Sequence, residues 1–284
     1  MIKTIPYTEL TVEKARAGCF VTDMPNAAYH AYEGISNSGL SMVARSPAHY
    51  AYRAAWKQTR AMEIGTAFHT ALLEPERFTQ EYMTVTGIND RRKSEYKEAA
   101  KVYGADATLT DSEGTSVAVM MESVLANPDA QNVLTADGWA ELSAFVQDPE
   151  TGVLLRCRFD WIASDGRAVD IKKTQDARAD AFSRSVLNYR YHCQQAMYSD
   201  VFEKITGRPL ESYRFLAIEE QPPCANVLYT LDDVSVMVGM QEYKTALMDY
   251  AIANKSNDWP AYSETSALIS LPEWALNEIE GEIV

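Results

Sequence analysis

Residues 153–173 read VLLRCRFDWIASDGRAVDIKK and carry the pattern of a β-hairpin. The stretches 153–162 and 168–173 are rich in apolar and β-branched side chains, which favours strands. Between them, Ser164-Asp165-Gly166 is typical of a three-residue hairpin loop in which the glycine takes a left-handed conformation as a bulge. A loop of this kind fixes which residues of the two strands face each other.

This register places two carboxylates opposite each other, Asp160 on the first strand and Asp170 on the second. Alternate side chains of a strand share a face, so Asp170 and Lys172 point one way while Val169 and Ile171 point into the core. Paired carboxylates repel unless a cation lies between them, and Mg²⁺ prefers oxygen ligands. The alternative is that Asp160 is a surface residue and that Asp170 and Lys172 form an ordinary exposed pair on an edge strand.

The remaining sequence predicts further helices and strands around this hairpin. Helices are expected at 38–57, interrupted at Ser46-Pro47, and at 62–73, 112–125, 179–205 and 234–253. Strands are expected at 140–147, 213–219 and 225–231. This order predicts an α/β fold, with a mixed central β-sheet flanked by helices on both faces.

Two pairs of residues at helical spacing accompany the hairpin. Gln194 and Tyr198 are four residues apart, so their side chains share one face of the expected helix. Gly65 and His69 have the same spacing in an earlier helix. Taken alone, each pair is more often structural, because a tyrosine with a polar neighbour or a single helical histidine commonly belongs to the core.

Together these motifs resemble those of the PD-(D/E)xK nucleases, and in particular the RecE-type (exonuclease VIII-like) exonucleases of phages and prophages. The matching residues are Asp160, the Asp170-Ile171-Lys172 motif, the QxxxY motif at 194–198 and the GxxxH motif at 65–69. The literal Pro-Asp of the superfamily name reads Phe159-Asp160 here, and only the carboxylate is chemically required.

The resemblance extends from Tyr29 to the C-terminus and includes the closing segment 271–274. It implies a restriction-endonuclease-like core within one exonuclease domain at residues 29–284. Residues 1–28 resemble nothing in the family and are expected to be an N-terminal extension of unknown role.

The resemblance also implies a magnesium-dependent exodeoxyribonuclease, in which Mn²⁺ can replace Mg²⁺. Asp160 and Asp170 are the expected metal ligands, with His69 and the backbone carbonyl of Ile171 as additional ligands. Lys172 is expected to orient and help deprotonate the attacking water, or to offset charge on the scissile phosphate.

The remaining implied catalytic residues, Gln194 and Tyr198, are expected to hydrogen-bond Lys172, the water or a substrate phosphate. The implied substrate is linear double-stranded DNA, digested from its ends in the 5′ to 3′ direction. The product is a 3′ single strand for a single-strand annealing recombinase, and such exonucleases commonly form closed rings.

Candidate DNA contacts lie in the first hundred residues. Ser38, Arg45 and Arg53 are candidates for a pocket that holds the terminal 5′-phosphate. Arg91 and Arg92, next to Lys93, are candidates for guiding the DNA, although a solvated run of charges is the alternative interpretation.

The formal net charge of −14 is unusual for a protein that binds a polyanion. The charge is unevenly distributed, since residues 1–103 hold 13 basic and 11 acidic side chains whereas residues 209–284 hold 3 basic and 13 acidic ones. A homo-oligomeric ring with its basic residues along the channel and its acidic quarter outward would reconcile this balance with DNA binding.

Cysteine spacing and hydropathy exclude several other classes of protein. Cys19, Cys157, Cys193 and Cys224 are widely separated, which argues against zinc, iron–sulfur and disulfide frameworks and for reduced, mostly buried thiols. No apolar run approaches the length of a membrane span, and the N-terminus has no signal-peptide pattern. The sequence therefore predicts a soluble, cytoplasmic protein with no membrane partner.

Two rival functions remain open. One is an endonuclease or a single-strand-specific nuclease with the same fold. The other is a non-catalytic DNA-binding protein that retains the fold, which the complete set Asp160, Asp170, Lys172, Gln194 and Tyr198 argues against.

Overall fold

The computed structural model describes residues 2–54, 58–262 and 265–271. Of the expected domain 29–284, residues 272–284 lie outside the described residues, and so do residues 55–57 of the expected helix 38–57. No helix within the described ranges combines the length and apolar character that a membrane span requires.

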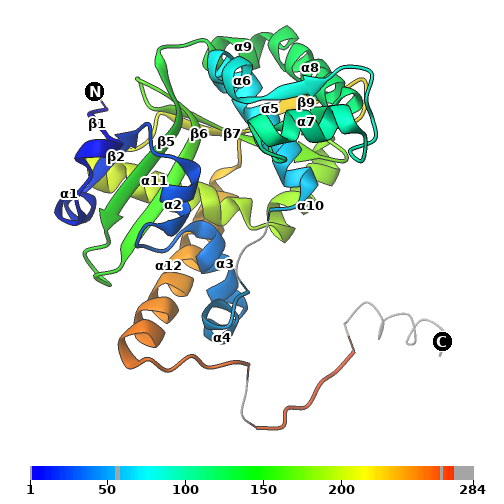
Figure 1. The fold of residues 1–284 in the computed structure, drawn as a ribbon. Helices are drawn as coiled ribbons and strands as arrows, with labels where there is room; N and C mark the ends of the chain where they lie inside the picture. Colours follow the sequence, from blue (N-terminus) through cyan, green and yellow to red (C-terminus); the bar gives the residue numbers. More distant parts are fainter. Residues whose placement is uncertain (1, 55–57, 263–264, 272–284) are drawn as a thin grey trace.

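A seven-stranded mixed sheet runs through the protein in the order β1-β2-β5-β6-β7-β8-β9 (Figure 1). Strands β5 to β7 form an antiparallel meander, β8 is parallel to β7, and β9 is antiparallel to β8. The strands of this sheet are β1 (Thr4–Pro6), β2 (Cys19–Thr22), β5 (Gly138–Gln147), β6 (Leu154–Ala163), β7 (Arg167–Thr174), β8 (Ser212–Glu219) and β9 (Asn226–Tyr229). A separate parallel pair comprises β3 (Met83–Val85) and β4 (Thr108–Thr110).

Helices cover both faces of the large sheet. The longer ones are α3 (Asn37–Arg45), α5 (Arg60–Leu73), α7 (Ser94–Tyr103), α8 (Asp111–Ala126), α10 (Ala179–Asn188), α11 (Tyr191–Thr206) and α12 (Asp233–Ser256). The shorter ones are the 3-10 turn Tyr7–Glu9, α1 (Val12–Ala17), α2 (Asn26–Ala31), α4 (Pro47–Ala51), α6 (Pro75–Glu81) and α9 (Pro128–Leu134). The expected mixed sheet flanked by helices is confirmed.

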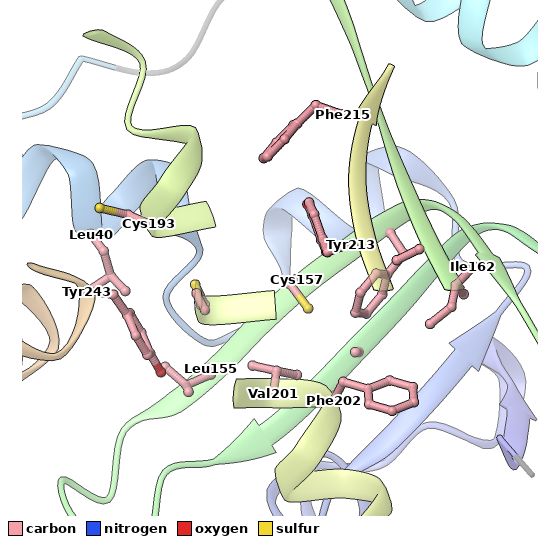
Figure 2. Packing of buried hydrophobic residues seen from close by; sticks show 14 of the residues in the cluster. Leu40, Leu155, Cys157, Ile162, Cys193, Val201, Phe202, Tyr213, Phe215 and Tyr243 are labelled. Atoms are coloured by element: carbon pink, nitrogen blue, oxygen red, sulfur yellow. The ribbon is translucent and has the colours of Figure 1, made fainter. Parts of the chain in front are cut away.

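Two hydrophobic cores lie on opposite faces of the sheet. One is shared by β5, β6 and β8 with α3, α10, α11 and α12, and Figure 2 shows part of it, including Leu155 of β6 with Val201 and Phe202 of α11. The other is shared by the sheet with α5, α8 and α9 and includes Val169 and Ile171. A strand that is covered on both faces buries most of its side chains, so polar residues in β6 and β7 must find partners inside the protein.

The central hairpin has the expected register. Trp161 pairs with Val169 and Ile162 with Ala168, which sets Asp160 opposite Asp170. Gly166 in the loop has φ of 101°, the left-handed region that glycine tolerates. The interpretation as an exposed edge pair is wrong, because β7 lies between β6 and β8 and Asp170 is 3% exposed.

The expected single helix at 179–205 is in fact two helices, α10 and α11. Arg190 between them has φ of 57°, a left-handed conformation that a continuous helix cannot accommodate. The break lies four residues before Gln194, so it sets the direction in which α11 approaches the strands. Sequence periodicity alone did not predict it.

Residues 2–28 of the expected N-terminal extension join the same sheet at one edge, where β2 pairs with β5. Phe20 packs against Phe202 with ring centroids 5.8 Å apart, so this segment also contributes to the main core. The four cysteines are free thiols, with Cys157, Cys193 and Cys224 buried and Cys19 half-buried.

Candidate active site

Three carboxylates lie at one level across the meander. Ala140 pairs with Trp161 and Leu142 with Phe159, so Glu141 of β5 faces Asp160 of β6. Asp160 in turn faces Asp170 of β7 by the hairpin register. A row of acids on three neighbouring strands is electrostatically unfavourable without a cation.

Two of these acids interrupt the normal strand pairing. Glu141 has φ of 48°, which is unusual for a residue other than glycine and marks local strain. Asp160 Oδ2 accepts a hydrogen bond from the backbone N–H of Ile171 at 2.7 Å. At this point a side chain of β6, rather than its backbone, pairs with the backbone of β7. The backbone is therefore shaped around the carboxylates.

His69 approaches the three carboxylates from the face of the sheet that α5 covers. It lies on α5, whose N-terminus Arg60 anchors through ion pairs with Glu63 and Glu113. His69 Nδ1 is 3.8 Å from Asp160 Oδ2 and 4.0 Å from Glu141 Oε1. Burial lowers the pKa of His69, which keeps the ring neutral and able to donate a lone pair.

Gly65, the other half of the GxxxH motif, has no packing requirement among the described residues. A Cβ at this position would meet nothing within 4 Å. The glycine is therefore not explained by contacts within the protein, and its open side leaves room beside the turn that precedes His69.

Asp170 is held by residues of two other elements. Its Oδ1 accepts hydrogen bonds from Gln194 Nε2 of α11 and, at 3.3 Å, from the Tyr213 hydroxyl of β8. Its Oδ2 lies 2.5 Å from Lys172 Nζ in an ion pair, and within the described part of the chain no other donor reaches it. The negative charge of this buried carboxylate is therefore balanced by the ammonium of Lys172.

Lys172 is fixed in a charged state. Its Nζ donates to Gln194 Oε1 at 3.0 Å and lies 4.5 Å from the centre of the Tyr191 ring. Burial lowers the pKa of Lys172, but the charges of Asp170 and Asp160 outweigh burial and raise it overall. Gln194 therefore aligns both the acid and the ammonium.

Tyr198 occupies the same region through ring packing. Its ring makes edge contacts with Phe159 at 5.2 Å and with Tyr213 at 6.0 Å between centroids. Burial raises the pKa of its hydroxyl well above the usual value, so the group stays protonated. The expected hydrogen bond to Lys172 is made by Gln194, and Tyr198 lines the cleft next to it.

These residues fit a divalent cation. One ligand atom each from His69, Glu141 and Asp160 lie within 4.8 Å of one another. Hard cations such as Mg²⁺ and Mn²⁺ take carboxylate and carbonyl oxygens, and the backbone of Ile171, the expected carbonyl ligand, lies within hydrogen-bond reach of His69. Among the described residues, His69 and Asp160 of the expected ligands thus lie together with Glu141, whereas Asp170 lies outside this group and contacts Lys172, Gln194 and Tyr213.

The sequence matches the family described as a PDDEXK-like domain of unknown function (DUF3799) over residues 36–272. The chain belongs to this family. Membership supports a hydrolase of the PD-(D/E)xK nuclease superfamily, whose members generally use divalent metals. No curated protein matches the sequence.

Among solved structures, the chain is similar to a protein from Eubacterium rectale described as a "putative exonuclease". The TM-score is 0.61 at 12% identity, with 90% of this chain and 98% of that chain covered. At this identity the likeness establishes a shared fold. A second structure, of a protein named SSO0001, has a TM-score of 0.29 at 15% identity over 68% of this chain and 86% of that one, and carries no argument.

Glu141 is a candidate ligand in this PDDEXK-like domain that sequence reasoning missed. It stands in the expected strand 140–147, where Leu142, Ala144 and Val146 are apolar. Extending the antiparallel register from the polar turn after Gln147 would have paired it with Asp160. The sequence contained this information, but using it required the registers of two consecutive hairpins, 140–162 and 153–173, to be predicted together.

A cationic cleft of about 790 Å³ adjoins the site. Among the described residues its lining contains Arg53, Arg156, Arg158 and Lys172 and no carboxylate. Ser38 lines it near the N-terminus of α3, where unpaired N–H groups favour anions.

The other expected DNA contacts lie outside this lining. Arg45 donates to the Tyr262 hydroxyl at 3.0 Å. Arg92 pairs with Asp90 at 2.9 Å, and its side chain is 89% exposed. Arg91 is exposed on the same loop.

Arg158 was also missed, and it connects the cleft to the metal ligands. Its guanidinium donates to the Met24 carbonyl and to Ser143 Oγ, both at 2.9 Å, and lies 4.3 Å from the centre of the Tyr29 ring. Nη1 is 3.8 Å from Glu141 Oε2. Met24 of the expected N-terminal extension therefore helps to hold Arg158 beside Glu141.

Proposed function

We propose that this protein is a metal-dependent exodeoxyribonuclease that digests linear double-stranded DNA from its 5′ ends. The observation that carries the proposal is the junction of the three-carboxylate layer with a cationic cleft, at Lys172. Such a cleft suits a terminal phosphate, because charge-assisted hydrogen bonds from arginine match phosphate geometry.

Residues of the chain provide a route for phosphodiester hydrolysis. Glu141, Asp160, Asp170 and His69, with the carbonyl of Ile171, would hold Mg²⁺ or Mn²⁺, which neutralises phosphoryl charge and lowers the pKa of bound water. Lys172 orients the attacking water or balances charge on the scissile phosphate, and Gln194 fixes its ammonium.

The test is a time course on a linear duplex labelled at one 5′ end, run beside a covalently closed circle with and without Mg²⁺. The proposal requires early release of the 5′ label as a short product, an intact circle and no reaction in chelator. Cleavage of the circle would instead identify an endonuclease, and cleavage of single strands alone would identify a single-strand nuclease. An Asp170→Asn variant controls for contaminating nucleases.

The charge distribution supports a homo-oligomeric ring as part of the same proposal. A monomer at −14 would repel duplex DNA over roughly a Debye length of 8 Å, unless subunits gather their basic clefts around one channel. Light scattering at working concentration should give a multiple of 31.7 kDa. The 3′ single strands produced would suit an annealing recombinase as a partner in DNA recombination, and a monomeric mass with processive digestion would refute the ring.

A further inference from the structure

A stack of aromatic rings leads from the catalytic lysine to the surface. Lys172 Nζ lies 4.5 Å from the centre of the Tyr191 ring. Tyr191 is stacked between Phe215, with centroids 5.8 Å apart at 24°, and Tyr189, 5.6 Å apart at 25°. Phe215 is buried, whereas Tyr189 is 66% exposed. The outer ring of the stack is thus free to take another planar group.

A second cavity, of about 530 Å³, is lined by both tyrosines. Its charged lining residues within the described chain, Lys173 and Glu220, form an ion pair at 3.0 Å. This neutral, aromatic cavity contrasts with the cationic cleft that Lys172 lines. A phosphate is favoured in the cleft, and a nucleobase is favoured in the cavity.

The turn that carries the two tyrosines is rigidly anchored. Glu242 of α12 contacts Arg190 at 2.9 Å, His192 Nε2 at 3.3 Å and Cys193 Sγ at 3.4 Å. Gly239 lies so close to the turn that a Cβ there would meet the His192 carbonyl oxygen at 2.3 Å. Arg190 forms an ion pair with the carboxylate of Glu242, which also contacts His192 and Cys193. These contacts anchor the turn to α12.

An exposed tyrosine on a rigid turn loses little conformational entropy when a base stacks on it. We propose that Tyr189, supported by Tyr191, is a stacking platform for the nucleobase on the 3′ side of the scissile phosphate. This inference rests on the proposed function, in which the terminal nucleotide occupies the cationic cleft. The second nucleotide of the cleaved strand then lies beyond Lys172, with its base unpaired from the complement.

A purely structural role for Tyr189 makes different predictions. If the ring only completed the turn at the end of α10, its removal would affect all substrates equally and would lower thermal stability. Stacking on a base is worth about 1–3 kcal/mol, or about 5- to 150-fold in affinity, and needs the ring but not the hydroxyl.

The experiment compares kcat and KM of the full-length protein on a 5′-phosphorylated linear duplex. Tyr189→Ala should raise KM about 5- to 150-fold with little change in kcat, because the stack stabilises the bound ground state and the transition state alike. Tyr189→Phe should restore the wild-type KM. Tyr103→Ala, at another exposed tyrosine on α7, is the matched control and should change neither constant.

The same constants are then measured on a duplex with an abasic second nucleotide. Wild type should lose affinity on this substrate, and Tyr189→Ala should lose none beyond its existing defect. An unchanged KM for Tyr189→Ala, a Tyr189→Phe variant as defective as alanine, or equal losses on intact and abasic DNA would each overturn the platform. If wild type cleaves no linear DNA, the proposed function itself fails.

Discussion

Glu141 and Asp160 face each other in the register of β5 and β6, yet neither belongs to the hydrogen-bonded ladder. The ladder pairs are regular on both sides of them, so the interruption is confined to the two acids. Glu141 takes a left-handed backbone conformation, and Asp160 accepts the Ile171 amide instead. Local strain of this kind persists where surrounding structure enforces it, and a shared cation would compensate for it.

Replacing Glu141 tests whether it is a metal ligand. Glu141→Gln should lower single-turnover cleavage by about 10²-fold or more, because one charged ligand is lost. In chelator the variant should be at least as stable as wild type, since one of two facing negative charges is removed. Glu150→Gln, at an exposed acid in the same hairpin's turn, should behave as wild type. Full activity of Glu141→Gln would remove it from the site.

The two adjacent lysines of β7 separate catalysis from stability. Lys172→Ala should lower the chemical rate about 10²- to 10⁴-fold while metal and DNA binding persist. Lys173 points to the opposite face, where it pairs with Glu220 at 3.0 Å, so Lys173→Ala should cost under about 1 kcal/mol of stability. Because Lys173 lines the second cavity, its loss can alter DNA binding, but at saturating DNA the rate should change little. Single-turnover cleavage at saturating DNA measures both. Equal rate losses would contradict the assignment of Lys172.

Stability without metal should fall as pH rises. Burial and then the Asp160 charge raise the pKa of Glu141 to about 8, and the same two causes raise that of Asp170 to about 6 despite Lys172. Both acids bind protons more tightly folded than unfolded, so their stabilising contribution is complete below the ordinary pKa of an acid. It is lost as pH rises through about 6 and then about 8.

The measurement is the thermal unfolding midpoint between pH 5 and pH 9 in chelator, compared with Glu141→Gln over the same range. The difference between the two proteins isolates Glu141 from all other titrating groups. Wild type should lose stability relative to the variant as pH rises from 5 to about 8, and Mg²⁺ should abolish that relative loss. A pH-independent difference would show that Glu141 ionises normally.

Arg158 should act through Glu141 on metal affinity. Arg158→Lys loses the fork that contacts Met24, Ser143 and Glu141, so the Mg²⁺ concentration for half-maximal activity should rise about 10- to 100-fold. Excess Mg²⁺ should recover much of the rate. Arg167→Ala, which removes a half-exposed pair with Asp165 at the hairpin loop, is the control. An unaltered Mg²⁺ requirement in Arg158→Lys would refute this role.

The sequence alone determined the central hairpin and the residues that it aligns. A three-residue loop with one glycine fixed the pairing of Asp160 with Asp170, because strand side chains repeat every two residues and a hairpin has few possible registers. Local periodicity likewise determined most helices and the mixed sheet. It could not place the break at Arg190, since that depends on a contact with Glu242, which is 52 positions away in the chain.

Only the tertiary structure decided which distant residues complete the site. Glu141 needs two hairpins in register, His69 reaches the layer from the opposite face of the sheet, and Arg158 is held by the N-terminal segment. Asp170 proved to be buried and Lys172 half-buried, because β8 covers the edge that the hairpin alone leaves open. Sequence patterns are local. The burial and the electrostatic environment of these side chains, in contrast, depend on helices and strands that are far apart in the chain.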